Sequence, residues 1–228
     1  MNHERVLVVA AHPDDEVLGC GGTIVKHRQR GDSVAVLIMA EGITSRSTEP
    51  SSQASELLDL HRTAERANRR LGVNELTLLR YPDNRMDTVA LLDVVKDIEV
   101  AIGKIRPTVV YTHHASDVNI DHRVIHDAVI AACRPLPGTE IRQLLFFEVP
   151  SSTEWRPPAS RPFFAPNWYV NIHDTLEVKL DALDVYASEM REFPHPRSRA
   201  ACEHLARWRG ATVGVSAAEA FELGRVLF

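Results

Sequence analysis

The chain has 228 residues, of which 44% are hydrophobic and 25% are charged, as in a globular protein that buries a sizeable core. Its formal net charge is −5. This composition excludes fibrous and disordered proteins, and the negative charge offers no basic field to a nucleic-acid backbone. We therefore expect no nucleic-acid partner.

The N-terminus and the cysteines indicate a cellular compartment. The first apolar stretch is short and is soon followed by charged residues, so it suits neither a signal peptide nor a membrane span. Cys20, Cys133 and Cys202 are far apart and lack C-x-x-C spacing, which argues against a disulfide framework or a thiolate metal site. We expect a reducing, cytoplasmic location.

The first elements alternate between strand and helix. Residues 5–11, RVLVVAA, form the apolar run typical of a strand buried on both faces. Residues 17–30 show helical spacing and end in basic residues before Gly31. Residues 33–39, SVAVLIM, predict a second buried strand. The Ser/Thr-rich residues 41–55 lack a period and predict an exposed loop.

The alternation continues, and it predicts an α/β fold with a mostly parallel, Rossmann-like sheet and helices on both faces. Strands are predicted over 74–82, 107–114 and 142–150, and helices over 54–71, 88–106 and 121–133.

The C-terminal part begins with a Pro-rich irregular stretch, 150–168. We expect one domain, 1–228, with a core over about 4–150 and a C-terminal α/β elaboration over about 151–228. In that elaboration we predict a strand over 168–172 and helices over 174–192, 198–208 and 216–226.

Polar clusters follow the predicted strands, where ligands bind in open parallel sheets. HPDDE follows the first strand and HHASDVNIDH follows the strand that ends near residue 114. His12, Asp15 and His122 together offer two imidazoles and one carboxylate, the ligand count of a hydrolytic zinc site that keeps one position open. Asp14 is then left as a general base for an activated water.

A purely structural interpretation of the acids stays open. Asp14, Asp15 and Glu16 could cap and charge the N-terminus of the helix that follows. Crowded acids beside a histidine would repel one another without a cation, however, and this favours a metal once His122 is added. His126 lies one helical turn after His122, but no H-E-x-x-H glutamate accompanies it, so we leave it out of the site.

The glycine-rich GCGG, residues 19–22, raises a second alternative, a dinucleotide site with Glu41 as the ribose-binding acid. The third glycine of that fingerprint would fall at Ile24, and acids occupy the turn where a pyrophosphate needs amide donors. We therefore favour close packing of the first helix on the sheet as the reason for the glycines.

The segments AHPDDEVLGCGGT and THHASDVNIDHR closely resemble the LmbE-like/PIG-L family of metal-dependent de-N-acetylases. YPDNRMD, EVPSSTEW, FPHPRS and AEAF look like further family segments, so the resemblance covers nearly the whole chain. It implies a Rossmann-like sheet, zinc on His12, Asp15 and His122, and Asp14 as the base. It also implies an N-acetylated amino sugar as substrate.

One residue departs from the family pattern. Several members have a histidine where this chain has Asn119, and that histidine helps to stabilise the oxyanion. We expect His195, or else His113, to supply this electrophile. Asp121 is expected to orient a metal ligand or to cap a helix. Arg62 resembles a family arginine that meets the sugar, although a surface role is nearly as well supported.

The sequence thus predicts a zinc-dependent hydrolase that removes an N-acetyl group from a small amino-sugar substrate. Fe²⁺ or Co²⁺ would suit the same ligands. The alternatives are a nucleotide-dependent oxidoreductase and a non-catalytic sugar- or metal-binding module. A homo-oligomer is compatible with the resemblance.

Overall fold

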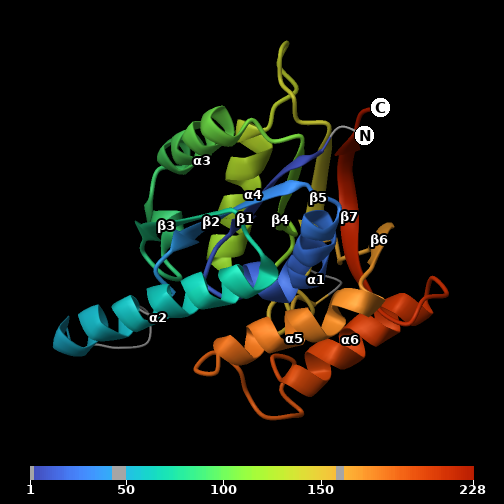
Figure 1. Ribbon diagram of the computed structural model, residues 1–228. Coiled ribbons are helices and arrows are strands. Elements are labelled where there is room, and N and C mark those ends of the chain that lie inside the picture. The colour runs from blue at the N-terminus through green and yellow to red at the C-terminus, as the bar shows by residue number, and fades with distance from the viewer. Residues whose placement is uncertain (1–2, 43–49, 158–161) are drawn as a thin grey trace.

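A single seven-stranded sheet organises the protein. The computed structural model describes residues 3–42, 50–157 and 162–228, and over these ranges the sheet is flanked by six α-helices (Figure 1). The strands are β1 (Arg5–Ala10), β2 (Ser33–Ala40), β3 (Glu75–Tyr81), β4 (Val109–His113), β5 (Gln143–Phe147), β6 (Trp168–Asn171) and β7 (Ala218–Val226). The helices are α1 (Asp15–Gln29), α2 (Pro50–Leu71), α3 (Leu91–Ile105), α4 (Ile120–Ala132), α5 (Leu176–Val185) and α6 (Arg199–Ala211).

The strand order is β3-β2-β1-β4-β5-β7-β6. The first five strands in this order pair in parallel, whereas β7 runs antiparallel to both β5 and β6. The order reverses between β1 and β4, since the chain builds outward from β1 to β3 and then returns to the other side of β1. Such a reversal opens a crevice beyond the carboxyl ends of the two central strands.

Helices cover both faces of the sheet, as predicted (Figure 1). Alternate residues of β1 enter different cores: Val6 and Val8 pack with residues of α1, α2, α5 and α6, while Leu7 and Val9 pack with residues of α3 and α4. A strand with apolar side chains on both faces must be covered twice, which is why RVLVVA has no polar alternation. The predicted α/β class is confirmed.

The glycines of GCGG let α1 approach the sheet and its neighbours. A Cβ on Gly19 would lie 2.4 Å from the ring of Phe147 on β5, and one on Gly22 would lie 2.9 Å from Cβ of Ile172. Both contacts are too short for any other residue. The close-packing interpretation is confirmed.

One predicted helix is wrong. Residues 216–226 include strand β7, which lies between β5 and β6 and pairs with both. The local sequence SAAEAFEL suits a helix, but two open strand edges and burial of Ala218, Ala220 and Phe221 outweigh that preference.

Other boundaries differ more modestly. The helix predicted over 174–192 ends at Val185. Helix α2 begins at Pro50, inside the predicted loop 41–55, and residues 43–49 of that loop lie outside the described residues. None of the helices in the described ranges has the length and apolar content needed to cross a bilayer.

Candidate active site

The loops after β1 and β4 bring the three predicted metal ligands together. Asp15 Oδ2 lies 3.3 Å from His12 Nδ1 and 3.2 Å from His122 Nε2. One ligand atom from each residue falls within 4.8 Å of the others, as a shared metal ion requires. His12 and Asp15 follow β1 directly, whereas His122 comes from the first turn of α4, so the reversal of strand order is what joins them.

Carboxylates hold the other nitrogen of His12. Its Nε2 lies 3.0 Å from Asp121 Oδ2 and 3.2 Å from Asp83 Oδ1. Asp121 is itself fixed by the backbone N–H groups of Asn84 and Met86, at 2.6 and 3.0 Å. A carboxylate behind a histidine fixes the ring and leaves the opposite nitrogen to face a cation. These contacts are consistent with the orienting role predicted for Asp121, which stays a prediction.

His122 is held in a similar way. Its Nδ1 lies 3.0 Å from Asp117 Oδ2, and its ring stacks on the buried ring of His113 with centroids 3.9 Å apart. The Asp117 carboxylate accepts hydrogen bonds from the hydroxyls of Ser152 and Thr153, in the loop after β5. Three strand-end loops thus cooperate to aim one imidazole nitrogen at Asp15.

The electrostatics of the cluster favour a cation. Burial opposes protonation of His12, but hydrogen bonds to Asp121, Asp15 and Asp83 outweigh it and raise the pKa of His12 well above its usual value. Burial likewise opposes protonation of His122, yet Asp15 and Asp117 raise its pKa to about 9. Without a metal the carboxylates thus retain protons on both rings. A divalent ion can replace those protons, so the donor set and its charge fit zinc.

Asp14 stands beside the cluster as a separate carboxylate. Its backbone is left-handed, with φ of 115°, a strained conformation for a residue other than glycine. The side chain makes no capping hydrogen bond to α1. Instead Asp14 Oδ2 accepts a hydrogen bond from Arg197 Nη1 at 3.1 Å, and Glu16 Oε2 accepts one from the Asp14 N–H at 3.0 Å. Asp14 thus occupies the N-cap position of α1, but its side chain does not cap the helix.

Burial also changes the acidity of Asp14. Removal from water raises its pKa to about 8, and the neighbouring carboxylates act in the same direction, while the charge of Arg197 opposes them. The protonated form of Asp14 is thus favoured while no cation is beside it, and a divalent ion on the neighbouring ligands would shift it back towards the carboxylate that a general base requires.

A cavity opens onto these groups. Its wall is formed by the residues His12, Pro13, Asp14, Asp15, Gly42, Asp83, Asn84, Asn119, His122, Glu189 and Arg197.

Two residues expected at the site lie elsewhere. His195 does not line the cavity; its ring meets Trp155 edge-on at 5.8 Å, and its Nδ1 accepts a hydrogen bond from the Arg197 N–H. Arg62 lies on the exposed side of α2 and faces Asp59 at 3.5 Å. The structure corrects both placements. Within FPHPRS it is Arg197, two residues after His195, whose side chain reaches the Asp14 carboxylate.

His113, the other candidate electrophile, is buried behind the cluster. Its Nε2 accepts a hydrogen bond from the Ala11 N–H at 2.8 Å, so that nitrogen has no proton to donate. Burial lowers its pKa well below the usual value, and the neighbouring His122 acts in the same direction, so the ring stays neutral. It supports β1 and His122 rather than a substrate.

Asn119 lines the cavity and also begins α4. Its Oδ1 accepts the Asp121 N–H at 2.8 Å as an N-cap, and its Nδ2 donates to Asn84 at 3.0 Å. The second Nδ2 proton is the hydrogen-bonding capacity that Asn119 retains.

Sequence reasoning missed Asp83, Asp117 and Arg197. Each lies in a segment singled out for its resemblance, namely YPDNRMD, THHASDVNIDHR and FPHPRS. The signal for Asp83 and Asp117 was their position after β3 and β4, whereas Arg197, between α5 and α6, was marked only by its place beside His195.

Fold and site together define a hydrolytic enzyme built on a Rossmann-like sheet. The chain belongs to the PIG-L family, described as GlcNAc-PI de-N-acetylase, whose sequence model matches residues 7–133. This confirms the resemblance drawn from the HPDDE motif.

Individual relatives agree with this assignment. The diacetylchitobiose deacetylase of Thermococcus kodakarensis is 30% identical over 203 residues, covering 83% of this chain and 71% of the relative. Among solved structures, the N,N'-diacetylchitobiose deacetylase of Pyrococcus horikoshii has a TM-score of 0.79 at 23% identity, covering 97% of this chain and 84% of that one. The fold is shared more widely, since GalB, a 4-carboxy-2-hydroxymuconate hydratase of Pseudomonas putida KT2440, has a TM-score of 0.73 at 19% identity, with 98% and 97% coverage.

Proposed function

We propose that the protein is a zinc-dependent hydrolase that removes the N-acetyl group from an N-acetylglucosamine-containing substrate. The observation that carries this proposal is the convergence of His12, Asp15 and His122 on one point, with Asp14 beside them as an acid that the ligand set does not use. Membership of a de-N-acetylase family and the names of the relatives support the choice of an acetylated amino sugar.

Different side chains of the protein have different roles in the proposed reaction. A zinc ion on His12, Asp15 and His122 would supply Lewis-acid polarisation of the acetyl carbonyl and lower the pKa of water. Asp14 takes the proton from the water as its oxygen attacks the carbonyl carbon. The same carboxyl then delivers that proton to the sugar nitrogen as the carbon–nitrogen bond breaks, so acetate and a free amine leave.

Arg197 is proposed as the protein's donor to the oxyanion, in place of His195. Its guanidinium lines the cavity and is shared between Asp14 Oδ2 and Ser151 Oγ, both at 3.1 Å. Five N–H donors leave capacity for a third acceptor. Asn119, which lines the same cavity, offers a neutral donor through its second amide proton.

The test is acetate release from a panel of N-acetylglucosaminyl conjugates, including diacetylchitobiose and inositol-, malate-, nucleotide- and lipid-linked forms, with zinc-loaded protein. Asp14→Asn should retain zinc while turnover falls by about 10²- to 10⁴-fold, the typical contribution of a general base. Asp32→Asn, a buried aspartate at the opposite end of the sheet, is the matched control and should keep its turnover.

Two results would contradict the proposal. Full turnover in Asp14→Asn would show that Asp14 is not the general base. Tight zinc binding without acetate from any conjugate would instead favour a non-catalytic binding module.

A further inference from the structure

Helix α1, which begins at the metal ligand Asp15, is broken in its middle. Cys20 has φ of −147° and ψ of 23°, outside the helical region, so residues 15–19 and 21–29 form two segments that meet at a kink. In a continuous helix the Gly22 N–H would bond to the Leu18 carbonyl, and the Thr23 N–H to that of Gly19. A buried break of this kind must find other partners for these groups.

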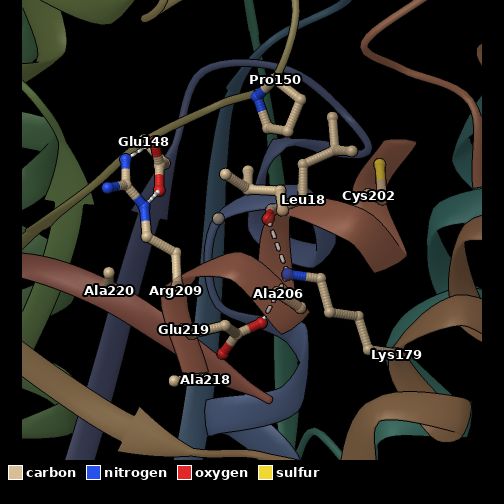
Figure 2. A pocket seen from close by; sticks show the side chains of 12 residues that line it. Leu18, Glu148, Pro150, Lys179, Cys202, Ala206, Arg209, Ala218, Glu219 and Ala220 are labelled. Carbon is tan, nitrogen blue, oxygen red and sulfur yellow. Dashed lines mark hydrogen bonds and ion pairs between the residues drawn. The ribbon is translucent and has the colours of Figure 1, made fainter. Parts of the chain in front are cut away.

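Two charged side chains from distant elements supply those partners (Figure 2). Lys179 Nζ, from α5, donates to the Leu18 carbonyl at 2.9 Å. The Glu219 carboxylate, from β7, accepts the N–H groups of Gly22 and Thr23 at 2.9 and 2.6 Å. Lys179 Nζ also lies 2.6 Å from Glu219 Oε1 and closes the arrangement.

The sign of each charge matches the helix end that it meets. The ammonium of Lys179 lies at the C-terminal, negative end of the first segment, and the carboxylate of Glu219 lies at the N-terminal, positive end of the second. Both side chains are buried, with exposed fractions of 6% and 3%. A buried ion pair is retained only where its groups are well satisfied, and here the broken helix satisfies both.

We propose that Lys179 and Glu219 are positioning residues for the active site. They fix the angle at which residues 15–19 leave the rest of α1, and this segment carries Asp15 towards His12 and His122. The catalytic part of this inference rests on the proposed deacetylase function; the positioning of Asp15 does not.

The orientation of residues 15–19 also affects the position of Asp14, the proposed base. Glu16 accepts the Asp14 N–H and is itself held by Asn68 Nδ2 and Tyr186 Oη, both at 2.8 Å. A rotation of the segment about Cys20 would move Asp15 and the Asp14 backbone together. The pair therefore controls both the ligand and the base.

The experiment compares Lys179→Met, Glu219→Gln and the double variant with the unmodified protein. Glu148→Gln is the control, because Glu148 forms a partly buried ion pair with Arg209, at 2.7 and 2.8 Å, on the wall of the same cavity as Lys179 and Glu219 (Figure 2). Zinc dissociation constants, kcat and KM are measured on folded protein. Amide hydrogen exchange is followed at residues 16–23.

Each single variant should weaken zinc binding about 10-fold or more and lower kcat similarly with little change in KM, because Asp15 would lose its fixed position. Amides of residues 16–19 should exchange faster. The double variant should regain thermal stability relative to Lys179→Met, since no unpaired charge stays buried, but it should not regain zinc affinity. Glu148→Gln should keep the affinity of the unmodified protein.

Unchanged zinc affinity in both single variants, or an equal loss in Glu148→Gln, would overturn the inference. So would recovery of zinc affinity in the double variant. If the single variants do not fold, hydrogen exchange in the unmodified protein still tests the inference. The inference requires slow exchange at the Gly22 and Thr23 amides, and fast exchange there would refute it. Absence of deacetylation with intact zinc and exchange results would refute the proposed function alone.

Discussion

Replacing Asp121 by Asn tests how the site is held in place. The Asp121 carboxylate accepts three hydrogen bonds: Oδ2 from His12 Nε2 and the Asn84 N–H, and Oδ1 from the Met86 N–H. Asparagine keeps the volume but turns one oxygen into an NH₂ group. Whichever way the amide is placed, at least one donor then faces another donor, and the negative charge behind His12 is lost.

The size of the effect follows from these contacts. A hydrogen bond to a charged group contributes about 1.5–3 kcal/mol, and a buried donor left unpaired costs about 1–3 kcal/mol. Since His12 then loses its fixed orientation, we expect zinc affinity to fall about 10- to 100-fold, or about 1.4–2.7 kcal/mol. Asp14 should keep its partner Arg197, because Asp121 takes no part in that hydrogen bond.

The assay is competition for zinc between the protein and a chromophoric chelator. Asp32→Asn is the control, because Asp32 Oδ2 contacts His27 Nδ1 at 2.7 Å in an equally buried pair at the opposite end of the strands. This control should lose stability but not zinc affinity. An Asp121→Asn protein that binds zinc as tightly as the unmodified one would refute the orienting role.

Two further predictions concern packing and pH. Gly19→Ala should lower the free energy of unfolding by about 1–3 kcal/mol in urea denaturation, because its Cβ would overlap the Phe147 ring; an unchanged midpoint contradicts this. Burial lowers the pKa of His27, against the opposing effect of Asp32, so the unfolded chain binds more protons between the folded pKa and 6.5. Stability should therefore fall as the pH drops through that window, and His27→Gln should reduce the slope of urea midpoint against pH; an identical slope would contradict the prediction.

Much of the fold could be predicted because a strand that is buried on both faces has a simple sequence pattern, a run of apolar residues. Strands β1 and β2 are unbroken apolar runs, and a strand of this kind needs helices on both sides. The acids and the histidine after β1 are polar groups that a hydrophobic core does not require, so they indicated the position of the proposed site. The juxtaposition of His122 with Asp15 followed from a rule of sheet topology rather than from any local signal.

Other features depend on contacts that no local pattern contains. Strand β7 takes its conformation from the two strands beside it, and its own residues favour a helix. Arg197 and His195 are separated by one residue, and only the path of the turn decides which one faces Asp14. Lys179 and Glu219 lie 40 positions apart in the chain, and the helix break that they satisfy is only suggested by the glycines of GCGG.

The placement of β7 has a consequence for the order of assembly. Edge strand β6 pairs with β7 and not with β5, although the ribosome makes β7 last of the three. Until β7 is synthesised, β6 therefore lacks the strand with which it pairs, and the edge of β5 that faces β7 stays unpaired. Strand β7 then pairs with β5 and β6 together. Through Glu219 it also binds the backbone of α1, the first helix of the chain.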